Sequence, residues 1–131
     1  MKKVIQNALE TPDGTILISG GRHDFKTYID TLTGVEYMVD GGYDYIRRNS
    51  TIPKEELSLF EEDTFETIRE KLLRGGRGIN GDEPLTYVRL KDLNPEWLEN
   101  LIKYEEENRP DNFFLKYYKQ EKQYRQDNFY T

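Results

Sequence analysis

Apolar and polar residues alternate over much of residues 3–60, a pattern typical of short strands with two different faces. The alternating runs are residues 4–10, 15–19, 26–30 and 35–40. Pro12 and Gly14 follow the first run, and Gly34 precedes the last. Because proline fixes φ and glycine accepts positive φ, hairpins are expected at both places. We therefore predict a β-rich segment over residues 1–60, arranged as an antiparallel meander.

The hydrophobic period changes to that of a helix after this segment. Apolar residues that share one helical face recur at Phe65, Ile68 and Leu72. We expect a helix over residues 63–75, which the glycine pair at 75–76 ends. Asp63 or Thr64 can cap its first N–H groups. Residues 85–90 alternate once more and predict one further strand.

Two C-terminal helices are expected within residues 95–126. Asn94 can cap the first, and Pro95 at its first position loses no needed donor. One face of this helix carries Trp97, Leu101 and Tyr104. Pro110 breaks it, and the residues at 111–112 can cap a second helix. The predicted fold is therefore α+β, an N-terminal antiparallel β-meander packed with C-terminal helices in one ligand-binding domain that spans residues 1–131.

Composition adds an expectation about assembly. Only 35% of the 131 residues are hydrophobic and 34% are charged, which is little material for a private core. The last 28 residues nevertheless hold eight aromatic residues, Tyr104, Phe113, Phe114, Tyr117, Tyr118, Tyr124, Phe129 and Tyr130. Aromatic side chains suit interfaces and ligand walls. We therefore expect a dimer, or a higher oligomer based on dimers, that associates through these helices.

Charge and residue usage exclude several classes of function. The 19 Lys and Arg residues stand against 25 Asp and Glu residues, and the net charge of -6 disfavours duplex nucleic acid. With no cysteine and one histidine, thiolate chemistry and a histidine-based zinc site are excluded. No apolar run is long enough for a membrane span, and the first residues lack the apolar centre of a signal peptide. We expect a soluble, cytoplasmic protein without a metal, a cofactor or catalytic residues.

The first candidate ligand residues are Arg22 and His23, which follow a glycine pair at the end of a strand. From this position their side chains can project into a cleft. The alternative is that His23, between Arg22 and Asp24, is a hydrogen-bonded fastener of the loop.

A second candidate stands beyond the glycine pair at 41–42. A short tyrosine-rich strand is expected over residues 43–48, and it ends in Arg47 and Arg48. Adjacent strand residues face opposite ways. One arginine, Arg47 among the candidates, can therefore face a pocket while the other forms a surface ion pair.

Arg74 and Arg77 flank the start of a glycine-rich stretch over residues 74–81. Glycines permit a backbone nest for an anion, and arginine supplies a planar, permanently charged fork. The spacing matches neither a P-loop nor a dinucleotide-binding turn. The alternative is a plain helix end followed by a loop.

The strongest candidates stand at the break between the two C-terminal helices. Arg109 is the first choice, followed by Asn112 and then Phe113 or Phe114. An arginine and the N–H groups of a helix start can bind phosphate, while an aromatic face can stack on a base. The alternative is that both phenylalanines belong to the core.

Residues 7–15, 22–25 and 37–48, with the sequences NALETPDGT, RHDF and YMVDGGYDYIRR, resemble the first-described family of phage Thoeris anti-defence proteins. The resemblance extends through the glycine-rich loop. It implies a sponge that binds, without cleaving, the cyclic ADP-ribose isomer made by a TIR-domain defence protein, in the cytoplasm of an infected bacterium. It also implies a dimer-based oligomer with pockets where C-terminal helices meet a partner, and in some members separate sites for cyclic oligonucleotides.

Two other classes of function stay open at this point. A protein-binding inhibitor of a host factor would use the aromatic C-terminus as its interface. A nucleotide phosphodiesterase would need a positioned histidine, for which His23 beside Asp24 is the only candidate.

Overall fold

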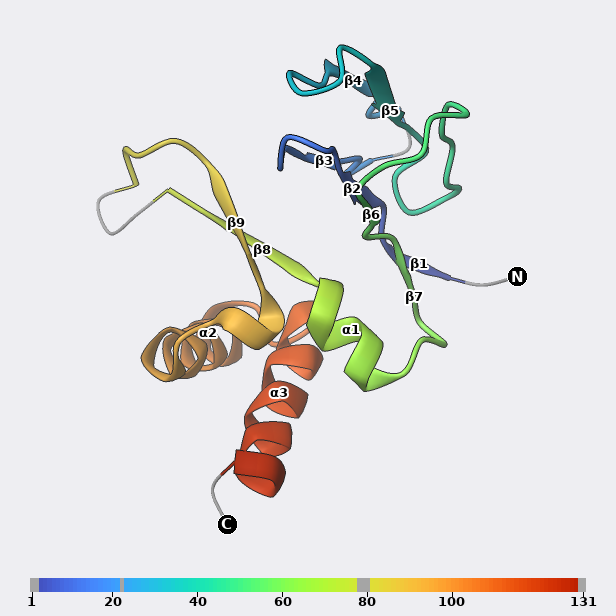
Figure 1. Ribbon diagram of the computed structural model, residues 1–131. Helices are drawn as coiled ribbons and strands as arrows, with labels where there is room; N and C mark the ends of the chain where they lie inside the picture. Colours follow the sequence, from blue (N-terminus) through green and yellow to red (C-terminus); the bar gives the residue numbers. More distant parts are fainter. Residues whose placement is uncertain (1–2, 22, 78–80, 130–131) are drawn as a thin grey trace. The chain divides into compact units, whose positions relative to one another are not determined.

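The computed structural model describes residues 3–21, 23–77 and 81–129, and the chain forms two compact units (Figure 1). The N-terminal unit is Met1–Thr64 and the C-terminal unit is Phe65–Thr131. Antiparallel strands build the first unit, and the α-helices of the described residues lie in the second. The predicted α+β class is confirmed. No helix within the described residues has the length and apolar character needed to cross a membrane.

The strands of the N-terminal unit are short and antiparallel. They are β1 (Val4–Gln6), β2 (Ala8–Glu10), β3 (Ile16–Ile18), β4 (Lys26–Ile29), β5 (Glu36–Val39), β6 (Glu55–Glu56) and β7 (Leu59–Phe60). β2 pairs with β3 and β4 pairs with β5, as the hairpin pattern predicts. β6 returns to pair with β2, and β7 returns to pair with β1. The last strands of this unit therefore pair with its first strands, in addition to the two hairpins between strands that are neighbours in sequence.

The two predicted hairpin turns are present and are joined by carboxylates. Gly14 and Gly34 take positive φ angles of 92° and 72°. Asp13 in the first turn accepts hydrogen bonds from the Tyr28 hydroxyl at 2.7 Å and from the Thr31 backbone N–H at 2.8 Å. Asp30 in turn accepts one from the Asp13 backbone N–H at 2.7 Å. The turns of the β2–β3 and β4–β5 hairpins thus hold each other in place.

Side chains from three strands form a small core beneath these turns. Leu9, Leu17, Tyr37 and Val39 are buried together, and Tyr28 packs against them. The register that pairs Tyr28 with Tyr37 places both rings on this inner face. Removal of their apolar surface from water is the main stabilising term for such a cluster.

The prediction of a strand over residues 43–48 is wrong. This segment forms turns, with one isolated bridge between Asp40 and Arg47. The reason is Asn7, whose fully buried amide donates to the backbone carbonyls of Asp40, Gly42 and Tyr45 at 2.8, 3.1 and 3.2 Å. Along a strand, carbonyls of residues an odd number apart point to opposite edges, so those of Gly42 and Tyr45 could not both face one side chain.

The C-terminal unit combines helices with one hairpin. Its elements are α1 (Phe65–Lys71), β8 (Leu73–Gly76), β9 (Thr86–Arg89), the 3₁₀ helix η1 (Leu90–Asp92), α2 (Pro95–Asn108) and α3 (Phe113–Phe129). The expected helix over 63–75 is shorter in the structure, because residues 73–76 pair with β9 instead of continuing α1. Glycine is a poor helix former, and the pair at 75–76 favours this change. The strand predicted over residues 85–90 is confirmed as β9.

Both C-terminal helices begin where the capping pattern predicts. The Asn94 side chain accepts from the Trp97 backbone N–H at 2.7 Å, and the Asn112 side chain accepts from Phe114 N–H at 3.0 Å. The buried face of α2 consists of Leu98, Leu101, Ile102 and Glu105. The face expected from the sequence is therefore only partly right, because Tyr104 is 52% exposed.

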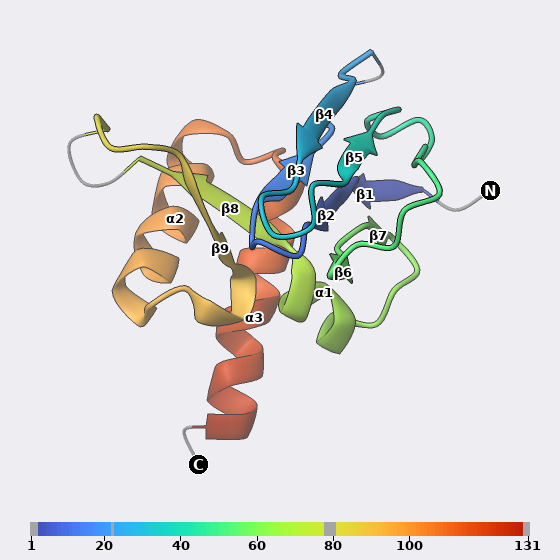
Figure 2. The ribbon, with the colours of Figure 1, turned by 45° about the horizontal axis from the view of Figure 1, so that its top comes forward.

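An ion cluster ties α1, α3 and η1 together. The fully buried Glu121 of α3 accepts from Arg69 of α1 at 2.8 and 2.9 Å and from Arg125 at 2.6 Å. Arg125 also donates to the Leu90 carbonyl at 3.2 Å. The hydrogen bonds to Glu121 raise the pKa of Arg69. Figure 2 shows α3 running beside α1, with α2 packed along it as well.

Candidate functional site

The break between α2 and α3 is organised by a buried carboxylate, Glu105. This residue is 1% exposed. It accepts a hydrogen bond from Arg109 Nη2 at 2.7 Å and another from Asn112 Nδ2 at 3.0 Å. The Arg109 guanidinium also lies 5.7 Å from the centre of the Tyr104 ring. Two predicted ligand residues are therefore brought together, and both are bound to Glu105.

Aromatic rings continue from this break along the start of α3. The Phe113 and Phe114 rings stack with centres 4.3 Å apart, and Phe114 stacks on Tyr118 at 6.0 Å. Phe113 is 40% exposed, whereas Tyr117 and Tyr118 are buried. The aromatic excess at the C-terminus thus serves the unit's own core in part and an outer surface in part.

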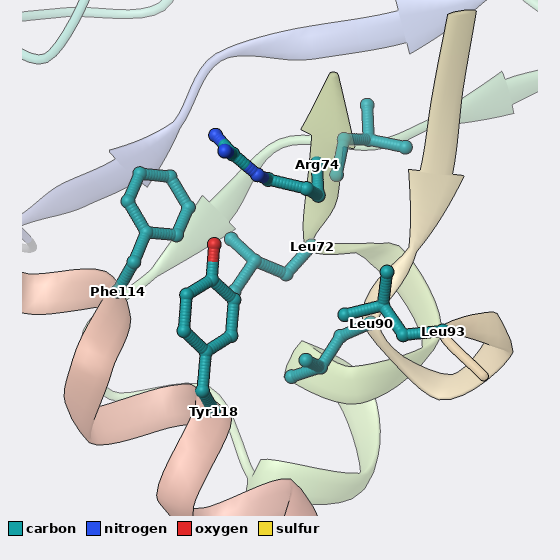
Figure 3. A pocket seen from close by; sticks show the side chains of 7 residues that line it. Leu72, Arg74, Leu90, Leu93, Phe114 and Tyr118 are labelled. Carbon is teal, nitrogen blue, oxygen red and sulfur yellow. The ribbon is translucent and has the colours of Figure 1, made fainter. Parts of the chain in front are cut away.

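Phe114 and Tyr118 line a recess in the C-terminal unit. The recess has a volume of about 150 Å³, including space open to solvent, and its lining residues are Leu72, Leu73, Arg74, Leu90, Leu93, Phe114 and Tyr118. Figure 3 shows Phe114 and Tyr118 extending from α3 toward Leu72, with the Arg74 side chain beside them and with Leu90 and Leu93 farther away. The lining is therefore aliphatic and aromatic, with one cationic side chain.

Arg74 is the unusual member of this lining. Its Nε atom is buried and has no hydrogen-bond partner. Among the described residues, its guanidinium forms no ion pair either. A buried, charged donor without an acceptor is unfavourable by about 1–3 kcal/mol or more. The group is therefore available to an anion from outside the chain.

Tyr118 presents a hydroxyl beside this guanidinium. Burial raises the pKa of Tyr118, while the charges of Arg74 and Arg109 act in the opposite direction. The hydroxyl is consequently protonated at neutral pH and can donate a hydrogen bond. Figure 3 shows its oxygen on the side of the recess where the Arg74 side chain lies.

Sequence reasoning singled out neither Glu105 nor Tyr118 as part of a site. The available signals were their spacings: Glu105 stands four residues before Arg109, and Tyr118 stands four residues after Phe114. Residues four apart meet on one face of a helix.

The glycine-rich stretch differs from the expected nest where the structure describes it. Residues 74–76 belong to β8, and neither Gly75 nor Gly76 has a positive φ angle. Arg77 is exposed and lies 3.5 Å from the Glu83 carbonyl. Residues 78–80 of the predicted nest lie outside the described residues. Arg74 therefore enters the recess from a strand.

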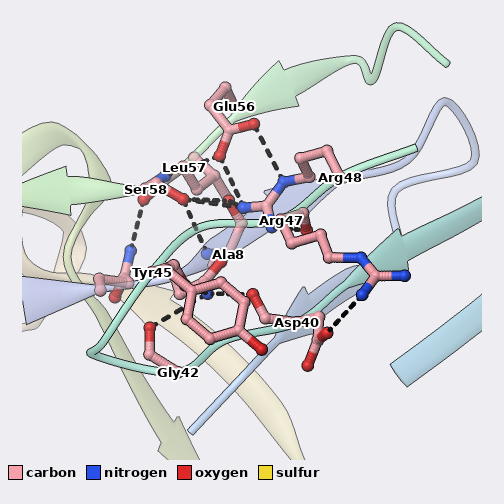
Figure 4. Close-up of polar contacts among 11 residues, drawn as sticks. Ala8, Asp40, Gly42, Tyr45, Arg47, Arg48, Glu56, Leu57 and Ser58 are labelled. Atoms are coloured by element: carbon pink, nitrogen blue, oxygen red, sulfur yellow. Dashed lines mark hydrogen bonds and ion pairs between the residues drawn. The ribbon is translucent and has the colours of Figure 1, made fainter. Parts of the chain in front are cut away.

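The remaining candidates belong to the N-terminal unit. Arg22 lies outside the described residues, and His23 is exposed in a loop. Arg47 is 3.7 Å from the Asp40 carboxylate, with its side chain 62% exposed. Arg48 turns the other way and binds Glu56 and Ser58, each at 2.8 Å (Figure 4). The expectation that the adjacent arginines face different ways is thus fulfilled by two loop residues.

Within the described residues, no group of three or more acidic or histidine side chains could hold a metal ion. Comparisons with protein-family models, with curated proteins and with solved structures gave no match to this chain.

Proposed function

We propose that this chain is a phage anti-defence sponge that binds a cyclic ADP-ribose isomer without cleaving it. By sequestering this TIR-derived signal in the cytoplasm of the infected bacterium, the protein would block Thoeris immunity. Cyclic oligonucleotides are a second ligand class to test. The observation that carries the proposal is Arg74, whose buried Nε has no hydrogen-bond partner among the described residues and which lines the recess with two aromatic rings.

The chemistry of the recess suits part of a nucleotide. A guanidinium fork can bind two oxygens of a phosphate, and charge-assisted hydrogen bonds of this kind are among the strongest in proteins. Stacking of a base on an aromatic side chain such as Phe114 contributes about 1–3 kcal/mol. Tight binding without a reaction requires no more than these contacts.

The size of the recess supports a dimer as part of the proposal. Ligand pockets for molecules of nucleotide size have volumes of about 300–1,000 Å³. The recess of one chain has no interior space that would admit a water molecule. One chain therefore does not enclose the ligand, and a second copy would have to supply most of the pocket.

Recovery of the ligand tests the proposal. The purified protein is incubated with cyclic ADP-ribose isomers or cyclic oligonucleotides, separated from free ligand and heat-denatured, and the released compound is identified by mass spectrometry. We expect intact cyclic ADP-ribose isomer in stoichiometric amount, from a protein whose light-scattering mass is that of a dimer or a multiple of it. A cleaved product would identify an enzyme, and the absence of any bound ligand would rule the sponge out.

The exposed rings near the break favour a second candidate function. Tyr104 is 52% and Phe113 is 40% exposed, and such a surface could bind a host protein as an inhibitor. A thermal-shift screen separates the two functions, because only a nucleotide binder is stabilised by cyclic nucleotides. The phosphodiesterase is not proposed, because the Asp24 carboxylate already binds the Gly20 N–H at 2.8 Å and Lys26 at 3.4 Å.

A further inference from the structure

We infer that Arg74 and Tyr118 bind one and the same oxyanion of the ligand, and that Arg109 is a positioning residue that does not hold the phosphate. This inference rests on the proposed function and names the anion site within it. It assigns a ligand contact to Tyr118 and separates two arginines that look equivalent in the sequence.

The first step concerns the donors of Arg74. Its Nε is buried without an acceptor, and no described residue neutralises the guanidinium. The residue itself is only partly buried, so part of its side chain reaches solvent. The recess admits no water molecule as it stands, so an oxyanion that satisfies the buried Nε must displace lining side chains, and it then pairs with the charge at the same time.

The second step concerns the hydroxyl of Tyr118. The residue is 2% exposed. It lies on the Arg74 side of the recess (Figure 3). Because burial keeps it protonated, it can donate to an oxygen that already accepts from the guanidinium. The two groups together offer a fork and a single donor to one phosphoryl group.

The third step removes Arg109 from the anion site. Its Nη2 is 2.7 Å from Glu105 Oε1, and the side chain of Glu105 is 2% exposed. If the guanidinium moved to a phosphate, a buried carboxylate would lose its cation, which is strongly unfavourable. Glu105 also holds Asn112, the residue that caps α3. Arg109 therefore acts through Glu105 on the position of Phe114 and Tyr118.

The apolar side chains of the lining specify what stands beside the anion. Leu72, Leu90 and Leu93 carry no polar side-chain atoms, and Phe114 offers a ring face. A phosphoryl group attached to a flat, weakly polar group fits these surroundings better than free phosphate does. The ligand class is a phosphate ester of a nucleoside, which agrees with a cyclic ADP-ribose isomer.

Calorimetry on five variants tests the inference, with cyclic ADP-ribose isomers and inorganic pyrophosphate as probes. Arg74→Ala is expected to weaken binding of both probes at least a hundredfold, and Arg74→Lys, which keeps the charge and loses the fork, about tenfold. Tyr118→Phe removes one hydroxyl and is expected to weaken both about tenfold, with the melting temperature of the free protein unchanged. Arg77→Ala is the matched control and is expected to change affinity less than twofold.

Arg109→Ala separates a positioning role from a phosphate contact. We expect a lower melting temperature, and a loss of cyclic ADP-ribose affinity smaller than that of Arg74→Lys. If Arg109→Ala abolished pyrophosphate binding while Tyr118→Phe and Arg74→Lys bound normally, the inference would be overturned and the sponge would stand. If pyrophosphate bound through Arg74 and Tyr118 while no cyclic ADP-ribose isomer bound, the anion site would stand and the sponge would fall. If Arg74→Ala does not fold, the affinities of Arg74→Lys and Tyr118→Phe decide the test.

Discussion

The two units treat their cationic side chains differently. Within residues 3–21 and 23–64, every lysine and arginine is within 4.0 Å of a carboxylate: Lys3 of Glu61, Lys26 of Asp24, Arg47 of Asp40, Arg48 of Glu56 and Lys54 of Glu10. In the part of the C-terminal unit that the structure describes, Arg74 lines a recess with no such partner. The difference separates arginines that hold a fold from one that is available to a ligand.

Arg48 and Arg74 make the contrast at the level of single atoms. The side chain of Arg48 is 16% exposed. Its guanidinium donates to both Glu56 oxygens, to Ser58 and to the Ala8 carbonyl (Figure 4). The Nε of Arg74 is also buried but has no acceptor. Burial of an arginine is therefore no guide to its role until its acceptors have been counted.

The largest expected effect comes from a substitution that destabilises the N-terminal unit. A side chain on Gly42, whose φ is +54°, would overlap the backbone of Gly21. Gly42→Ala combines left-handed strain with this overlap, so we expect a loss of about 3 kcal/mol or more in the free energy of unfolding. Urea unfolding followed by circular dichroism measures it.

Gly34→Ala is the matched control for this change. Gly34 also has a positive φ, of +72°, but a Cβ there would meet no atom within 4 Å. The strain then acts alone, and the expected loss is about 1 kcal/mol. Equal losses in the two variants would show that the close approach of the two glycine loops is unimportant.

Sequence reasoning located most elements because their signals are local. The hairpin turns at Gly14 and Gly34 and the helix starts at Asn94 and Asn112 depend on the residue itself and its near neighbours. The errors lie where a distant partner decides the structure. Asn7 draws the carbonyls of residues 40–45 toward itself across more than thirty positions, which no local pattern reveals.

The candidate site shows the same limit. The sequence marked Arg109, Asn112 and Phe114 as a group, and the structure brings them to the same helix junction. The sequence did not reveal that Glu105 already binds Arg109 and Asn112. Which arginine lacks an acceptor depends on the packing of β8 against α3 and η1, and single-sequence patterns carry no information on such a contact.

A smaller effect is expected when the stability of the N-terminal unit is measured as a function of pH. The Thr31 N–H, followed by the hydroxyls of Tyr28 and Thr15, lowers the pKa of Asp13 in the folded protein. The hydrogen bonds to the ionised Asp13 carboxylate therefore stabilise the fold at pH values above the pKa of an unfolded aspartate, about 3.9. This stabilisation is lost as the pH falls toward the pKa of Asp13 in the folded protein. Asp13→Asn is expected to lower the urea midpoint at pH 7, and its difference from the parent protein should shrink between pH 4 and pH 2.

Asp82→Asn provides the reference for this pH series. Asp82 is exposed in the C-terminal unit, and its replacement is expected to leave the urea midpoint unchanged at each pH. A difference between Asp13→Asn and the parent that stayed constant down to pH 2 would mean that the carboxylate charge does not hold the two hairpin turns together.

The smallest expected effect concerns Arg47, which the sequence offers as a ligand residue. Its ion pair with Asp40 is 3.7 Å long and its side chain is 62% exposed. Exposed pairs of this kind contribute about 0–1 kcal/mol, so Arg47→Gln should change the free energy of unfolding by less than about 0.5 kcal/mol. Arg48→Gln, which removes a guanidinium that is 16% exposed and bound to both Glu56 oxygens and to Ser58, should lower the free energy of unfolding by about 1–3 kcal/mol. Because the cations of the N-terminal unit are already paired, we also expect Arg47→Gln to bind cyclic ADP-ribose isomers within twofold of the parent protein by calorimetry. A large loss of affinity would place Arg47 at the ligand and would end the division of roles between the two units.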